Sequence, residues 1–150
     1  MNATPAPLPP PDQPGYPSLA ALGFARGRAE FFWIAGLSLV NSLLTSFGAH
    51  VRFPVGMGVT AASDAIFNEV LKDGGNIAKL AAIAFSLFAS GIVALFAWLT
   101  GRGNRVIFIL GIVLYILDGV LCLVFQDWFS VAFHAWITFK LFQSWSQTRE

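Results

Sequence analysis

Four stretches of this chain are long and apolar enough to cross a lipid bilayer, and they constrain its fold more than any other feature. They are residues 31–49, 80–99, 106–125 and 128–145. At about 1.5 Å per residue, helices of these lengths cover roughly 27–30 Å, which matches the hydrocarbon core of a bilayer. Because backbone amides in lipid must pair within their own segment, each stretch is expected to be a helix. The sequence predicts an all-α integral membrane protein, a four-helix transmembrane bundle.

The overall composition agrees with a bilayer as the surrounding medium. Charged residues make up 11% of the 150 residues, hydrophobic residues make up 56%, and the mean hydropathy is +0.68. A soluble domain carries about 25% charged residues, so a water-soluble globule is excluded. The net charge of +1 argues against a nucleic-acid partner. A single cysteine, Cys122, excludes an intrachain disulfide framework, and we expect no metal and no cofactor.

The first 29 residues are predicted to lie outside the membrane. Seven of the eight prolines fall within the first 17 residues, and such a stretch has too few apolar residues to bury. We therefore expect residues 1–29 to form a disordered cytoplasmic tail and linker. Residues 30–146 form the predicted transmembrane domain, and residues 147–150 form a short cytoplasmic tail.

The connections between the predicted spans differ in length. Residues 101–105 and 126–127 are so short that they predict antiparallel hairpins. The longer connection, residues 50–79, contains an apolar face and a polar face at helical spacing, which predicts a short amphipathic helix on the external membrane surface. The predicted helix starts at Thr60 or Ser63 and stops at Gly74-Gly75; its apolar face is Ile66, Phe67, Val70 and Leu71, and its polar face is Asp64, Asn68 and Lys72. A re-entrant dip of residues 54–58 is the alternative for the start of this connection.

Basic residues in the loops predict the orientation of the chain. Six of them lie on the side of the termini: Arg26, Arg28, Arg102, Arg105, Lys140 and Arg149. Only Arg52, Lys72 and Lys79 lie on the other side. Because cytoplasmic loops carry the excess of Lys and Arg, both termini are expected in the cytoplasm, and the bacterial inner membrane is the expected location.

Asp118 and His134 are the most informative polar residues within the predicted spans. Each lies eight residues from Gln126, so both are about 12 Å below the turn of the last hairpin. Asn41 and Tyr115 are placed to join them in an intramembrane polar cluster. One interpretation is a hydrogen-bonded pin between helices, and the other is a proton or ion site. An axial haem ligand is a third interpretation, weakened because the only other histidine lies in a loop.

Small residues form a stripe on the second predicted span. Ala82, Ser86, Ser90 and Ala94 recur at four-residue steps, and such a stripe lets a second helix approach closely. The sequence contains no catalytic motif, so we expect no catalytic residues and no enzymatic activity.

These observations predict a small non-enzymatic membrane protein. A structural or accessory subunit that packs against itself, as a homo-oligomer, or against a larger membrane complex fits them best. The alternative is a small oligomeric transporter or channel that uses Asp118 and His134.

Overall fold

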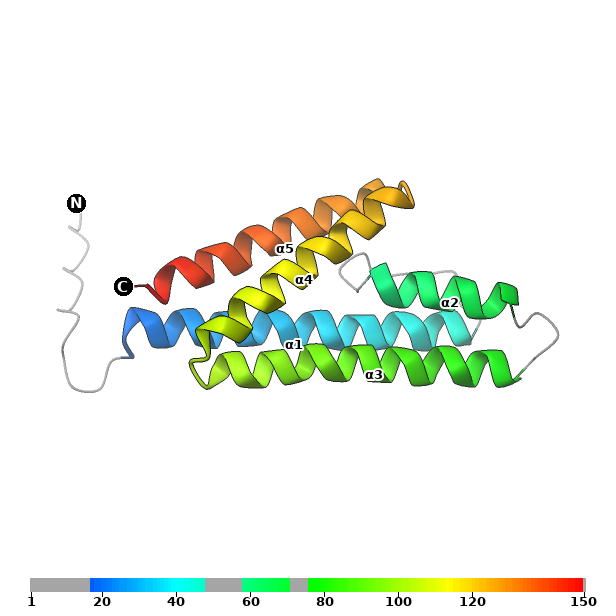
Figure 1. The fold of residues 1–150 in the computed structure, drawn as a ribbon, viewed down its shortest axis with the longest axis horizontal. Helices are drawn as coiled ribbons and strands as arrows, with labels where there is room; N and C mark the ends of the chain where they lie inside the picture. Colours follow the sequence, from blue (N-terminus) through cyan, green and yellow to red (C-terminus); the bar gives the residue numbers. More distant parts are fainter. Residues whose placement is uncertain (1–16, 48–57, 71–75, 150) are drawn as a thin grey trace, which may run out of the picture.

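The computed structural model describes residues 17–47, 58–70 and 76–149 of the chain. Within these residues all regular structure is helical, which confirms the all-α prediction (Figure 1). The helices are α1 (Leu19–Ser46), α2 (Gly58–Val70), α3 (Asn76–Gly101), α4 (Arg105–Val124) and α5 (Trp128–Gln147).

Two of the helices are long and apolar enough to cross a membrane. They cover Lys79–Gly101 in α3 and Arg105–Val124 in α4. Among the described residues α1 and α5 are also long, but they are less apolar because polar and charged side chains interrupt them. The fold thus supports two of the four predicted spans on length and composition.

The first helix begins earlier than the sequence predicted. α1 starts at Leu19, so residues 19–29, which were expected to belong to the linker, are helical. Ser18 precedes the helix, and its Oγ accepts a hydrogen bond from the Ala21 amide over 3.2 Å, as an N-cap does. Ala, Leu and Arg, all strong helix formers, dominate the first turns and favour this extension. The proline-rich stretch of residues 1–16 lies outside the described residues.

The long helices alternate in direction along the chain. α1 and α3 lie side by side as an antiparallel pair, and α4 and α5 form a hairpin that crosses this pair at an angle (Figure 1). The turn between α4 and α5 is tight: Gln126 adopts a φ of 58°, and Asp127 caps α5 by accepting the Ser130 amide over 3.1 Å. The two pairs diverge toward this turn, and α2 begins at the mouth of the opening between them and extends beyond the hairpin beside α1 and α3.

An aromatic core joins the helices at the end where α1 begins and α5 finishes. Phe108 of α4 is fully buried there, and its ring centroid lies 5.9 Å from Phe31, 6.2 Å from Phe24 and 5.8 Å from Trp145. Gly111 makes room for this packing, because a Cβ at that position would lie 2.5 Å from the Phe31 ring. α1, α4 and α5 are thereby tied together at this end of the molecule.

The small-residue stripe of α3 faces α1. Ala82, Ser86 and Ser90 are buried, and Ala94 is half-buried. The Ser86 hydroxyl shares a hydrogen bond with the hydroxyl of Ser42 on α1. The stripe thus lies at a close helix–helix contact, in keeping with the role of small residues between membrane helices.

α2 differs in position from the amphipathic surface helix that was predicted. It runs beside α1 and α3, roughly along their direction, rather than across the end of the bundle (Figure 1). The Phe67 ring packs 6.2 Å from Phe85 of α3, whereas Ile66 is exposed. The helix starts at Gly58, before both predicted caps, because Asp118 of α4 accepts hydrogen bonds from its first amides. The side chains of Asp64, Asn68, Val70, Leu71 and Lys72, and Gly74-Gly75, are outside the described residues.

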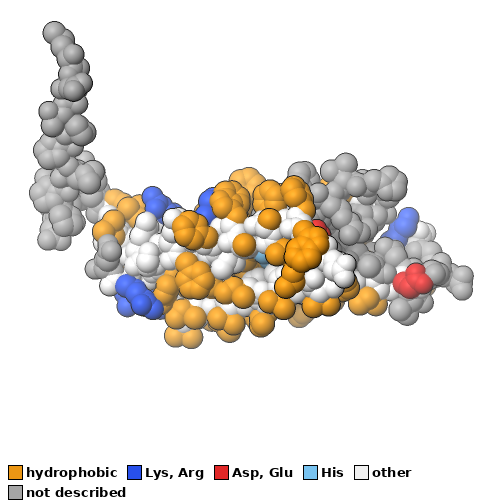
Figure 2. Space-filling view, turned by 90° about the horizontal axis from the view of Figure 1, so that it is seen from above, with side chains coloured by type: hydrophobic (Ala, Val, Ile, Leu, Met, Phe, Trp, Pro, Cys, Tyr) orange, Lys and Arg blue, Asp and Glu red, His pale blue; other side chains and the backbone are white. Residues whose placement is uncertain are grey.

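Large apolar side chains cover the outer faces of α3, α4 and α5. Leu87, Leu117 and Phe139 are examples, each with more than half of its side chain exposed. Figure 2 shows such a face, on which hydrophobic side chains dominate and most of the Lys and Arg side chains lie toward the end where α1 begins.

Candidate functional site

The Asp118 carboxylate is the centre of a polar site that joins three helices. Its Oδ2 accepts a hydrogen bond from the Gly58 amide over 2.7 Å, and its Oδ1 accepts one from the Val59 amide over 2.8 Å. The Nε2 atom of His134 lies 2.9 Å from Oδ2. One side chain of α4 therefore contacts both the start of α2 and the middle of α5.

The two amide contacts make Asp118 the N-cap of α2. The first amides of a helix have no partner within the helix, and they carry its positive dipole end. A cap is usually the residue before the helix, but here the carboxylate comes from a different helix. Gly58 allows this approach, because a Cβ there would lie 2.5 Å from the Cys122 Sγ and 3.2 Å from the Asp118 carbonyl oxygen. α2 starts at Gly58 because Asp118 satisfies its first amides.

The contacts of His134 define where its protons lie. Nδ1 lies 2.8 Å from the Ser130 carbonyl oxygen, which only accepts hydrogen bonds, so Nδ1 carries a proton and donates. The 2.9 Å contact of Nε2 with the Asp118 carboxyl requires one further proton between these two atoms. With that proton on either atom, the pair of side chains is neutral overall.

Tyr115 completes the surroundings of this pair. Its ring stacks on the imidazole of His134, with centroids 4.6 Å apart and planes 18° from parallel. Its side chain is 5% exposed, and its hydroxyl has no hydrogen-bond partner among the described residues. The stacking holds the imidazole plane in place, and the hydroxyl is buried without a partner among the described residues.

The structure brings together Asp118, His134 and Tyr115 of the predicted cluster. His134 contacts the Asp118 carboxylate, and Tyr115 stacks on His134, whereas a place for Asn41 in this cluster stays a prediction. The sequence reasoning missed Gly58 and Val59. A glycine before a helical pattern was the only signal for them, and it does not reveal a cap supplied 60 residues away in sequence.

The site also brings together three side chains of the kinds that ligate metal ions. The donor atoms of Asp118, Cys122 and His134 lie within 4.8 Å of one another. A cation at this point would take the place of the proton between His134 and Asp118, and the Nδ1 contact with a carbonyl is one that metal-bound histidines often make. In the arrangement described, the Asp118 and His134 atoms are used to hold α2, α4 and α5 together.

A second set of polar contacts lies toward the other end of the bundle. Lys140 of α5 forms an ion pair with Glu30 of α1, with 3.2 Å between Nζ and Oε1. Arg26 donates to the Gln147 side chain over 3.2 Å, and Arg105 donates to the Thr148 carbonyl oxygen over 2.7 Å. These contacts place the start of α1, the start of α4 and the end of α5 at one end of the molecule.

Comparison with protein families, with curated proteins and with solved structures found no match to this chain.

Proposed function

We propose that this chain is a small non-enzymatic integral membrane protein, a structural or accessory subunit that packs against itself or against a larger membrane complex. The observation that carries the proposal is that both carboxylate oxygens of Asp118 have hydrogen-bond partners on other helices. Both carboxylate oxygens accept backbone amides of α2, and one also contacts His134. The most costly polar group of the helical region is thus committed to joining helices rather than to an exchangeable ligand.

The membrane location is supported by the outer surface of the bundle. Large apolar side chains face outward along α3, α4 and α5, as lipid requires. At the end where α1 begins, the Arg102 guanidinium lies 3.7 Å from the Trp98 ring centroid, and that of Arg149 lies 5.2 Å from the Trp145 ring centroid. Pairs of Arg and Trp are typical of the membrane–water interface.

A four-span arrangement follows if α1 and α5 cross the bilayer beside α3 and α4. Their alternating directions suit four crossings with both termini on one side. Two of the charges that make α1 and α5 less apolar compensate each other, since Lys140 pairs with Glu30 between these two helices. The concentration of arginines at that end favours the cytoplasm for it, and the bacterial inner membrane is the proposed location.

An accessory role needs a partner surface, and the outer faces of α4 and α5 offer one. Trp136 and Phe139 of α5 and Leu117 of α4 are exposed, and membrane helices associate through such packing contacts without a soluble domain.

The association state of the purified protein tests this proposal. We expect a mass above that of the 16.2 kDa monomer when the protein is extracted in mild detergent and measured by native mass spectrometry. Introducing Lys at Phe139 should reduce association, whereas Lys at Arg102, in the exposed turn after α3, serves as the control. A monomer at every concentration, with no partner after crosslinking in the membrane, would contradict an accessory role.

The alternative function is a small oligomeric transporter or channel. It is favoured by the proton that lies between His134 and Asp118, because proton relays in membranes use such pairs. A flux measurement, argued in the Discussion, separates it from the accessory role.

A further inference from the structure

Three side chains that can ligate a metal ion meet where α4 contacts α5. Asp118 and Cys122 are one turn apart on α4, and His134 of α5 contacts Asp118. A carboxylate oxygen, the Cys122 Sγ and a ring nitrogen of His134 lie within 4.8 Å of one another. All three side chains are largely buried, with His134 3%, Cys122 5% and Asp118 10% exposed. Three protein donors of these kinds form the protein part of many zinc sites.

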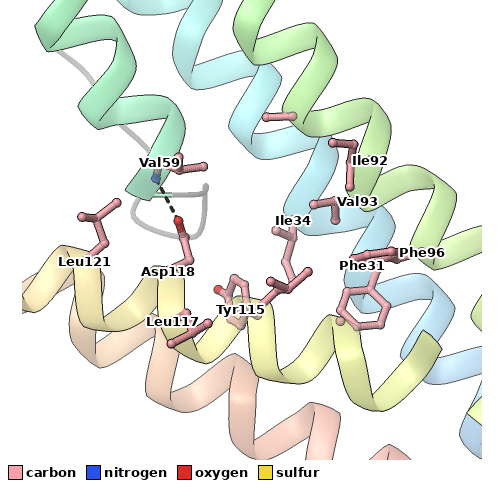
Figure 3. A pocket seen from close by; sticks show the side chains of 13 residues that line it. Phe31, Ile34, Val59, Ile92, Val93, Phe96, Tyr115, Leu117, Asp118 and Leu121 are labelled. Atoms are coloured by element: carbon pink, nitrogen blue, oxygen red, sulfur yellow. Dashed lines mark hydrogen bonds between the residues drawn. The ribbon is translucent and has the colours of Figure 1, made fainter. Parts of the chain in front are cut away.

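The hydrogen bonds around these donors orient them as metal ligands are oriented. Nδ1 of His134 donates to the Ser130 carbonyl oxygen over 2.8 Å, so Nε2 is the nitrogen that faces Asp118. A metal-bound histidine makes such a contact with its other nitrogen, because it fixes the ring and raises the basicity of the ligand. The Asp118 carboxylate accepts amides at the start of α2, and Figure 3 shows the contact with Val59. Carboxylates that ligate a metal are held by hydrogen bonds in the same way.

The distances between the donors are close to those around a tetrahedral zinc ion. Nitrogen and oxygen ligands at about 2.0 Å from zinc lie roughly 3.3 Å from each other. Nε2 of His134 and Oδ2 of Asp118 are 2.9 Å apart, so they need to separate by only roughly 0.4 Å. A sulfur ligand at about 2.3 Å lies roughly 3.5 Å from the other two, so the Cys122 Sγ has to approach by at most roughly 1.3 Å. Gly58 leaves room for this sulfur, because a Cβ there would lie 2.5 Å from it.

Charge balance favours a divalent ion at this point. One proton lies between His134 and Asp118, and the buried Cys122 thiol carries another. A divalent ion that displaces both protons is bound by one carboxylate, one thiolate and one neutral imidazole. The site then stays neutral overall, which matters because an uncompensated charge among membrane helices is costly.

The donor types select zinc among the divalent ions. Mg²⁺ and Ca²⁺ prefer oxygen ligands, whereas thiolate and imidazole ligands suit Zn²⁺. Three protein ligands leave one position of the tetrahedron for a water molecule. The single cysteine led us to expect no metal, because it excludes a cluster of several cysteines. A mixed donor set needs only one.

We propose that Asp118, Cys122 and His134 form a zinc site that joins α4 to α5, in which the ion takes the place of the proton shared by Asp118 and His134. The ion leaves the cap of α2 in place, because Oδ1 and the second lone pair of Oδ2 still accept the Val59 and Gly58 amides. The proposal goes beyond the accessory role, and it holds whether or not the chain associates with a partner.

Zinc binding to the full chain in mild detergent tests the site. The protein is stripped with a chelator and dialysed against zinc in the presence of a chromogenic competitor, and the bound metal is measured by elemental mass spectrometry. We expect saturation at one zinc per chain, with no displacement by excess Mg²⁺. Cobalt, used as a spectroscopic substitute, should show a thiolate charge-transfer band. Zinc content no higher than that of protein-free detergent, displacement by Mg²⁺, or bound cobalt without this band would overturn the assignment.

Cys122→Ser is the most direct variant, because Cys122 takes no part in the hydrogen bonds that join α2, α4 and α5. We expect zinc binding to weaken at least about tenfold, since even the partners of metal ligands contribute this much. Adding Leu123→Cys to this variant moves the thiol to an exposed neighbouring position and should not restore binding. Unchanged affinity in Cys122→Ser, or restored affinity with the relocated thiol, would overturn the proposal.

The two histidines of the chain provide a matched pair of variants. His134→Gln removes the nitrogen ligand and should weaken zinc binding at least about tenfold. His50→Gln is the control, because it makes the same chemical change at the other histidine. An equal loss of zinc in both variants would assign the binding to histidine in general and overturn the site.

Discussion

The backbone amide of Gly58 donates a hydrogen bond of 2.7 Å to the carboxylate of Asp118, a residue 60 positions later in the chain. This contact makes the start of α2 dependent on α4. Since His134 contacts the same carboxylate, the position of α5 depends on it as well. One ionisable side chain therefore fixes the relative positions of three helices.

Replacing Asp118 by Asn should destabilise the protein, although Asn is similar in size. The carboxylate accepts from two amides and contacts His134, whereas Asn has one acceptor oxygen and an NH₂ group that would face a donor. We expect a loss of about 1–3 kcal/mol in unfolding free energy in detergent. Asp127→Asn is the matched control, because Asn caps a helix about as well as Asp. Equal stability of the two variants would contradict the three-donor arrangement.

The candidate site was predictable only in part. Equal distances from the turn at Gln126 place Asp118 and His134 at one depth, and helical periodicity places Tyr115 on the same face of α4 as Asp118. A contact between Asp118 and His134 alone would tolerate Asn at position 118. The α2 amides change this expectation, and no local pattern around Gly58 reveals them because they are backbone groups.

The fold, like the site, was predictable from the sequence only in part. The lengths of the apolar runs predict which residues form α3, α4 and α5, because these helices form where apolar residues are removed from water. The start of α1 at Leu19 depends instead on helix propensity outside the apolar run. The proline-rich residues before Leu19 favoured the prediction of a linker there. The placement of α2 beside α1, α3 and α4 depends on a tertiary contact, which amphipathic spacing does not encode.

Two serines on α3 should respond in opposite ways to removal of the hydroxyl. Ser86→Ala loses the hydrogen bond with Ser42 and should cost about 0.6 kcal/mol, the average for such bonds in membranes. Ser90 is also buried, but its hydroxyl has no partner among the described residues, so Ser90→Ala should be neutral or stabilising. Thermal unfolding of both variants in one detergent provides the comparison. A larger loss for Ser90→Ala would contradict the contacts of α3.

The aromatic core should tolerate truncation poorly. Phe108 is fully buried against Phe31 and Trp145, so Phe108→Ala should cost about 3–5 kcal/mol. Phe139 of α5 is 59% exposed, and Phe139→Ala in a monodisperse detergent preparation is the control with the same chemical change. Chemical unfolding should show the difference as a shift in midpoint for Phe108→Ala alone. Similar shifts would mean that the Phe108 cluster does not hold the helices together.

The proposed orientation can be checked by labelling. Gly103 lies between α3 and α4, and Asn76 begins α3 at its opposite end. In a Cys122→Ala background, a cysteine introduced at Asn76 should react with an impermeant thiol reagent added to intact cells. One introduced at Gly103 should react only after the cells are opened. The reverse pattern would place the termini outside.

Proton flux separates the accessory role from the transporter. In proteoliposomes with a pH gradient and a potassium diffusion potential, we expect no proton entry above that of protein-free liposomes. The physical reason is that the pair is largely buried, so releasing the shared proton would leave an uncompensated negative charge between His134 and Asp118. A protonophore added at the end shows that the vesicles are sealed. Flux in the wild type that is lost in Asp118→Asn, but retained in the comparably destabilised Phe108→Leu, would instead establish a proton pathway through this pair.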